Sequence, residues 1–158
     1  MWLKNIIDED FTNYKTCSMV LGFPTCTWKC ERDCSVSGLC QNAALAQAPS
    51  IEVDIQVVVK RYLANPLSHA IVCAGLEPFD SPDDLLELIE EFRKYSLDDV
   101  VIYTGYRKEE ITEQLLKLRE FQNIVIKFGR FVPGQEKHFD EVLGVCLASN
   151  NQRAERVS

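Results

Sequence analysis

The stretch that decides the fold is residues 69–105, HAIVCAGLEPFDSPDDLLELIEEFRKYSLDDVVIYTG. It begins with a short, almost wholly apolar run that ends at a glycine, a pattern that predicts a buried strand. A helix is predicted next, because Ser81 can cap it, Pro82 fits its first position, and apolar residues recur at helical spacing as far as Phe92. A second apolar run at residues 99–105 predicts another buried strand. The stretch is therefore one strand–helix–strand unit.

Similar elements flank this unit on both sides. Apolar runs at residues 17–23 and 123–129 predict two further buried strands, and residues 55–65 and 107–121 predict helices. Strands that alternate with helices of this length imply right-handed crossovers and a parallel sheet. Such apolar strands are typical of a sheet that helices cover on both faces. The pattern predicts an α/β fold.

Length and composition limit the possible classes of protein. The chain has 158 residues, of which 46% are hydrophobic and 26% charged, and its formal net charge is −7. These values indicate one globular domain over residues 1–158. A loop is expected at residues 24–42, and an irregular C-terminal segment at residues 130–158 with one short strand around residues 142–148.

Charge and apolar patterning also restrict partners and location. The acidic chain lacks the basic footprint of a nucleic-acid-binding protein, so nucleic acid is not an expected partner. No apolar run is long enough for a membrane span, and the N-terminus is too acidic for a signal peptide. We therefore expect a cytoplasmic protein without a membrane partner, whose thiols stay reduced.

Four loops follow the carboxyl ends of the predicted strands, where parallel sheets bind their ligands. They are PTCTWKCERDCSVSGLCQN, GLEPFDSP, TGYRKEE and GRFVPGQ, at residues 24–42, 75–82, 104–110 and 129–135. Because these ends share one edge of the sheet, the cysteine-rich loop, the acidic-proline loop and the Thr-Gly-Tyr loop are expected to meet. The topology thus predicts one candidate site from three unusual segments.

The chain has seven cysteines, and four of them lie within residues 26–40. An odd number excludes a complete set of internal disulfides, and clustered cytosolic cysteines favour metal ligation. The others lie in apolar runs and are interpreted as small buried hydrophobic residues: Cys17, Cys73 and Cys146.

Three kinds of chemistry remain open for the four clustered cysteines. Structural zinc would use all four thiolates, but their spacings of three, three and five residues include no C-x-x-C pair. An iron–sulfur cluster accepts irregular spacing, and three ligands would leave one iron open for substrate. The third possibility is redox-active or simply buried free cysteine.

Five motifs, in this order, are similar to those of the small radical S-adenosylmethionine (SAM) enzymes: GFPTCTWKC…CQN, GLEPF, YTGY, FGRFVP and ASNNQR. The chain most resembles the activating proteins of anaerobic ribonucleotide reductase, whose C-x3-C-x2-C loop has His-Asn after the last cysteine. The resemblance extends from about Cys17 to Arg153. It implies a single-domain partial (open) βα barrel of about four to six mostly parallel strands.

The resemblance also implies a set of cluster ligands. Cys26 and Cys30 match the first two. The third is either Cys40, which precedes Gln41-Asn42 as the family's last cysteine precedes His-Asn, or the nearer Cys34. We favour Cys40 and keep Cys34 as the runner-up, because the loop before the last ligand is longer here than in the family.

A cofactor site is implied beside these ligands. GLEP matches the family's Gly-Gly-Glu-Pro stretch, which meets the methionine amine of SAM, with Leu in place of the second Gly. Phe128 stands where the family has Asp, so no role transfers to it. The implied cofactor-binding residues are Trp28, Gly75, Leu76, Glu77, Pro78, Thr104 and Tyr106.

The implied activity needs two cofactors, a [4Fe-4S] cluster and SAM. Reductive cleavage of SAM gives a 5′-deoxyadenosyl radical, which by analogy removes a hydrogen atom from a glycine of a large glycyl-radical enzyme such as anaerobic ribonucleotide reductase. A flavodoxin or ferredoxin is the implied reductant. The alternative is a non-catalytic zinc- or cluster-binding module for interaction or electron transfer.

Overall fold

The computed structural model describes all 158 residues and has an open, six-stranded sheet at its centre. The strands lie in the order β10-β7-β6-β5-β3-β2. The inner four are parallel: β3 (Ser18–Phe23), β5 (Ala70–Gly75), β6 (Asp99–Tyr103) and β7 (Ile124–Phe128). The antiparallel edges are β2 (Asn5–Asp10) and β10 (Arg153–Arg156). The two edges do not pair with each other, so the sheet does not close into a barrel.

Three main helices connect the parallel strands: α3 (Ile55–Leu63), α4 (Pro82–Arg93) and α5 (Thr112–Leu118). Asp54 caps α3, because its Oδ1 accepts a hydrogen bond from the backbone N–H of Gln56 at 2.7 Å. Ser81 occupies the cap position of α4, but its side chain makes no capping bond and instead pairs with Thr25 at 2.9 Å. Ser81 therefore occupies the predicted N-cap position of α4, but the predicted side-chain capping bond is absent.

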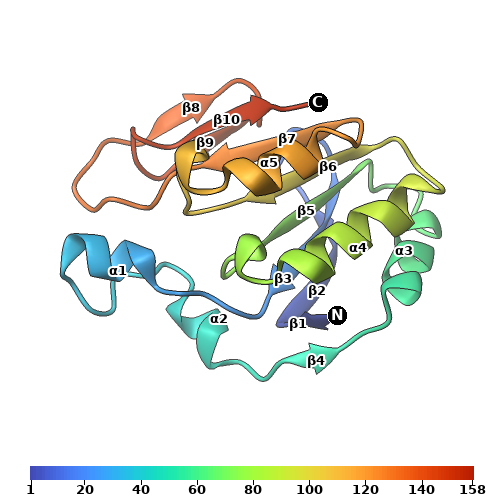
Figure 1. Ribbon diagram of the computed structural model, residues 1–158, viewed down its shortest axis with the longest axis horizontal. Coiled ribbons are helices and arrows are strands. Elements are labelled where there is room, and N and C mark those ends of the chain that lie inside the picture. The colour runs from blue at the N-terminus through green and yellow to red at the C-terminus, as the bar shows by residue number, and fades with distance from the viewer.

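The helices cover only one face of the sheet (Figure 1). Alternate strand residues such as Leu21 and Ile102 pack beneath the helices in a core of 23 buried residues. The opposite face holds a smaller cluster of 9 buried residues, crossed by the paired row Val20, Val72, Val101 and Val125. The expectation of helices on both faces is wrong, because this second face is covered by chain segments other than helices.

The second face is covered by Tyr14 in the segment after β2 and by a hairpin of β8 (His138–Asp140) and β9 (Val145–Leu147). The C-terminal segment is thus less irregular than expected, since β8, β9 and β10 all lie in it. The short strand predicted around residues 142–148 is confirmed as β9. A small pair of β1 (Trp2–Leu3) and β4 (Ile51–Glu52) completes the strands.

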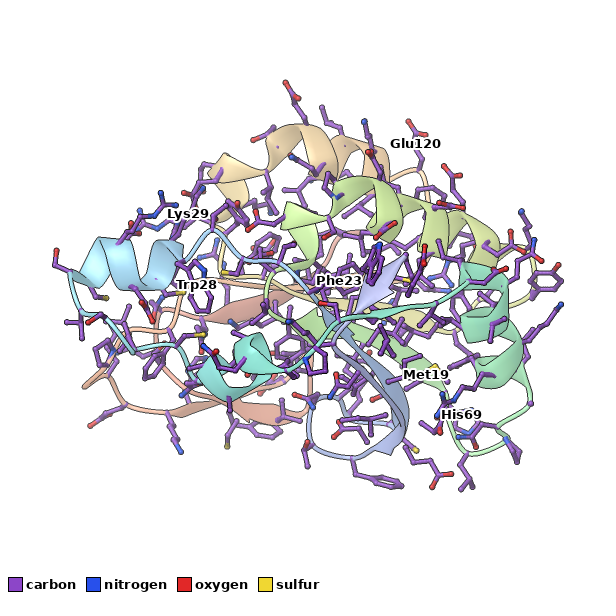
Figure 2. All side chains as sticks on the ribbon, turned by 90° about the horizontal axis from the view of Figure 1, so that it is seen from below. Met19, Phe23, Trp28, Lys29, His69 and Glu120 are labelled. Carbon is purple, nitrogen blue, oxygen red and sulfur yellow. The ribbon has the colours of Figure 1, made fainter.

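The cysteine-rich loop lies beyond the carboxyl ends of the parallel strands. It contains α1 (Lys29–Cys34) and is followed by α2 (Ala43–Gln47). Figure 1 shows both short helices in the lower left of the picture, on the opposite side from α3. In Figure 2, Trp28 and Lys29 lie at the opposite end of the molecule from Met19 and His69, which are near the amino ends of β3 and β5. The loop is therefore at the edge where ligands are expected.

Candidate functional site

A cavity of about 430 Å³ lies on the hairpin-covered face, at the carboxyl ends of the strands. This volume is in the range of small-molecule sites. The cysteine-rich loop, the loop after β5 and the loop after β6 all contribute to its wall. Seven of the residues singled out from the sequence line it: Cys26, Cys30, Cys40, Gly75, Leu76, Glu77 and Thr104.

Four cysteines lie in this wall: Cys26, Cys30 and Cys40 of the cysteine-rich loop, all half-buried, and Cys146 of β9. Cys146 is exposed, so its interpretation as a buried hydrophobic residue is wrong. Two of the three loop sulfurs accept backbone hydrogen bonds. Trp28 N–H donates to Cys26 Sγ at 3.2 Å, and Asn42 N–H donates to Cys40 Sγ at 3.4 Å. Cys34 ends α1 and does not line the cavity. The structure thus brings together Cys26, Cys30 and Cys40 and leaves Cys34 outside.

Burial affects the protonation of two of the loop thiols, Cys26 and Cys30. It raises the pKa of Cys26 to about 11, although the Trp28 amide acts in the opposite direction. Burial also raises the pKa of Cys30, against the smaller lowering effect of the Phe131 backbone amide. In the metal-free chain these thiols therefore hold their protons, and metal binding releases them.

The arrangement of the cysteines favours an iron–sulfur cluster over a closed zinc site. No group of three or more His, Cys, Asp or Glu side chains is placed to hold a single metal ion. A closed zinc tetrahedron is therefore not preassembled, since one of the four sulfurs also lies outside the cavity. Three cysteine sulfurs spread around one cavity, two of them with backbone N–H donors, fit the larger thiolate-ligated iron–sulfur cluster.

Glu77 connects two of the loops in the cavity wall. Its carboxyl group is buried, with 4% of the residue exposed, and accepts hydrogen bonds from Thr104 Oγ1 at 2.7 Å and Gly105 N–H at 2.8 Å. A third bond comes from Phe79 N–H at 3.2 Å, in the short 3-10 helix η1 (Pro78–Asp80). Burial raises the pKa of Glu77 to about 7, although these bonds oppose the shift. The side chain therefore fixes the relative position of the two loops.

Three of the expected cofactor residues do not line the cavity: Trp28, Pro78 and Tyr106. Trp28 is 36% exposed, and Pro78 is buried at the start of η1. Tyr106 instead donates its hydroxyl proton to Asp80 at 2.5 Å, and Asp80 also accepts from the Thr27 backbone N–H at 2.7 Å. These contacts hold the start of the cysteine-rich loop against the loops after β5 and β6.

An ionic network holds the other side of the same loop. The Arg130 guanidinium makes two hydrogen bonds to the Glu110 carboxylate, at 2.8 and 2.7 Å, and its Nε lies 3.0 Å from Asp33 of α1. The Arg130 guanidinium holds the pKa of Glu110 at about 2. Lys29 adds an ion pair to Glu110 at 3.7 Å and lies over the Tyr106 ring at 4.0 Å. The loop is therefore attached to the sheet through side chains as well as backbone.

Sequence reasoning assigned no role to Lys127 or Gln152, yet both line the cavity. Lys127 Nζ donates to the Gly129 carbonyl at 2.9 Å, and Gln152 Nε2 donates to the same oxygen at 3.2 Å. A signal was present for Lys127, since it is the only charged residue in the apolar run NIVIKFG. An ionisable residue inside a buried strand is a reason to expect a site.

Comparisons with known proteins give one family. A family model described as a 4Fe-4S single cluster domain matches residues 17–154, which is most of the chain. Comparison with curated proteins found no match, and neither did comparison with solved structures. Separately, none of the helices is long and apolar enough to span a membrane.

Proposed function

The chain belongs to the 4Fe-4S single cluster domain family, and from this premise we propose that it is a radical SAM enzyme whose cluster is held by Cys26, Cys30 and Cys40. The observation that carries the proposal is that, of the four cysteines in the cysteine-rich loop, these three line one cavity and Cys34 does not. Three protein ligands to a four-iron cluster leave one iron for a small molecule. Such a vacancy is what SAM cleavage needs and what a closed electron carrier lacks.

The bound cluster supplies the electron that cleaves SAM into methionine and a 5′-deoxyadenosyl radical. The chain's residues bind and orient the SAM molecule beside it. The Leu76 carbonyl accepts no hydrogen bond within the chain, and the residue lines the cavity, so this oxygen suits the methionine ammonium. Asn42 Nδ2 donates to the neighbouring Gly75 carbonyl at 2.5 Å and so connects the segment after Cys40 to this strand end. Fixed geometry of this kind lowers the entropic cost of bringing reacting groups together.

We further propose that the radical removes a hydrogen atom from a glycine of a large glycyl-radical enzyme, such as anaerobic ribonucleotide reductase, with a flavodoxin or ferredoxin as reductant. The support for this partner is the order of the five motifs, GFPTCTWKC…CQN to ASNNQR, along nearly the whole chain.

The test begins with anaerobic reconstitution of the full chain with iron and sulfide. We expect about four irons per chain and, after reduction with dithionite in the presence of SAM, formation of 5′-deoxyadenosine. The Cys34→Ala variant should give the same product. A loaded protein that makes no 5′-deoxyadenosine and needs all four cysteines would be an electron carrier. One zinc and no iron would identify an interaction module.

A further inference from the structure

Lys127 places a positive charge inside the cavity, next to the proposed ligands. It belongs to β7, only 7% of the residue is exposed, and it is the only cationic side chain in the cavity wall. Its ammonium group donates to the Gly129 carbonyl and to no other acceptor in the chain. It forms no ion pair. Two of its three N–H donors are therefore left for whatever occupies the cavity.

The neighbouring cation, Arg130, differs from Lys127 because carboxylates pair with it. Both cations act on the Cys30 thiol electrostatically, each favouring its ionised form. However, Arg130 is matched by two carboxylates, Glu110 and Asp33, so its charge is balanced within the chain. Lys127 has no carboxylate within ion-pair distance. Of the two, only Lys127 brings unbalanced positive charge to the cavity.

Glu77, the only carboxylate in the cavity wall, favours the charged form of Lys127 from a distance but forms no ion pair with it. Its oxygens already accept bonds from Thr104, Gly105 and Phe79, and no ion pair joins it to the ammonium group. Burial lowers the pKa of Lys127 to about 8, so most of the ammonium stays charged at neutral pH. A buried cation without an ion-pair partner is costly, and a negative group that binds in the cavity reduces this cost without loss of the proton.

We propose that Lys127 is the counter-cation of the bound cluster and raises its reduction potential. This inference depends on the proposed ligation by Cys26, Cys30 and Cys40. Reduction transfers one electron from the external low-potential donor to the cluster, whose negative charge grows by one while the donor is oxidised by one electron. A fixed positive charge nearby stabilises the more negative state and so favours reduction.

The position of the ammonium group is fixed by the loop after β7. Gly129 has φ of +102°, and a Cβ there would lie 3.1 Å from the Asn151 carbonyl oxygen. The Gly129 N–H donates to the Tyr106 carbonyl at 3.0 Å. Because Gln152 donates to the same Gly129 oxygen that Lys127 uses, that oxygen is held from two directions. The lysine is therefore a positioned charge.

The test is a redox titration of the loaded full chain without SAM, followed by the electron paramagnetic resonance signal of the reduced cluster. Wild type is compared with Lys127→Met, Lys127→Arg and Lys60→Met, the last removing an exposed charge on α3. We expect a more negative midpoint potential for Lys127→Met, a potential near wild type for Lys127→Arg, and no change for Lys60→Met. Equal potentials for all four proteins would overturn the inference.

Thermal unfolding is a second measurement, which still tests the inference if a variant binds the cluster incompletely. Thermal unfolding of metal-free Lys127→Met should occur at the same temperature as wild type or higher, because an unbalanced buried charge has been removed. Cluster binding should then raise the unfolding temperature of Lys127→Met less than that of wild type. Lys127→Gln serves as a substitute if Lys127→Met does not fold. An equal gain on cluster binding in wild type and the neutral variant would contradict a counter-cation.

The outcomes also separate this inference from the proposed function. A chain that takes up no iron contradicts the proposed function. A chain that binds the cluster and cleaves SAM, but whose potential does not respond to Lys127→Met, contradicts only the inference. Weaker SAM binding in Lys127→Met at an unchanged potential would show that the lysine holds the SAM carboxylate instead, which also overturns it.

Discussion

The two faces of the sheet are built for different purposes. The helix-covered face holds 23 buried residues in a continuous apolar core under α3, α4 and α5. The hairpin-covered face holds only 9, and it surrounds a cavity with polar groups and cysteines in its wall. Burial of apolar area is the main source of folding free energy, so most of the stability comes from the first face. The second face can therefore hold unpaired and reactive groups.

Substitution of the proposed ligands should give the largest effect, which is loss of the cluster. It also tests whether stability and cluster binding depend on different faces of the sheet. Cys26→Ala, Cys30→Ala and Cys40→Ala should each lose the bound iron, whereas Cys34→Ala should retain it. The metal-free variants should unfold within about 0.5 kcal/mol of wild type, because none of the three side chains belongs to either core cluster. Iron analysis and denaturant unfolding check both parts. Global unfolding of these variants would contradict the conclusion that the stability comes mainly from the helix-covered face.

A pair of matched leucines compares the faces in stability. Leu88 of α4 is 1% exposed in the helix-side core, and Leu147 of β9 is 3% exposed in the hairpin-side cluster. Leucine-to-alanine changes in cores cost about 2–5 kcal/mol. We expect Leu88→Ala near the top of this range and Leu147→Ala near the bottom, since the hairpin can collapse onto the smaller side chain. Urea unfolding of the metal-free chain measures both, and equal losses would contradict the comparison.

Gly75 lies where β5 enters the cavity wall, and its replacement should have an intermediate effect. Its φ is +87°, and a Cβ would lie 2.7 Å from both Gly22 Cα and the Phe23 backbone nitrogen. We expect Gly75→Ala to cost about 2–3 kcal/mol, because backbone strain of about 1–2 kcal/mol adds to the clash. Gly38→Ala is the control, with φ of +74° and no atom within 4 Å of the new Cβ. Equal losses in urea unfolding would show that the clash contributes nothing.

The smallest effect is expected from the Glu110–Arg130 ion pair, which joins the short 3-10 helix η2 (Lys108–Glu110) to the segment after β7. Because the pKa of Glu110 is lowered from 4.5 to about 2, its stabilisation is complete above pH 4.5 and is lost as the pH falls toward 2. The Glu110 side chain is 31% exposed, so screening limits the contribution to less than about 1 kcal/mol. Glu110→Gln should therefore be less stable than wild type at pH 7 and approach it at pH 3. A constant difference from pH 7 to pH 3 would contradict the role of this charge, with Glu113→Gln as the control.

Much of the fold could be predicted because its central elements carry their own patterns. The strands that became β3, β5, β6 and β7 are apolar runs, and α4 has a periodic apolar stripe. The edges could not be predicted, since β2 is NIIDED and β10 is RAER. Charged edge strands lack the apolar run or alternation that predicts a buried strand. They pair only once the rest of the sheet is in place. For the same reason, the sequence could not tell which face the helices leave free.

The candidate site was predictable to the extent that topology decides it. The carboxyl ends of parallel strands share an edge, so the approach of Cys26 and Glu77 to one cavity followed from strand order. The side-chain directions did not follow: Tyr106 turns to Asp80 instead of the cavity. Lys127 escaped notice because strand alternation sends it to the cavity side, and the sequence alone did not reveal that this side is hollow.

The separation of the sulfurs from both cores also has a consequence for biogenesis. Leu21, Ile102 and their neighbours can complete the scaffold before any metal is bound at Cys26, Cys30 and Cys40. Iron and sulfide can then be delivered to a finished polypeptide after translation. The metal-free chain is then a folded precursor that needs only iron and sulfide to mature.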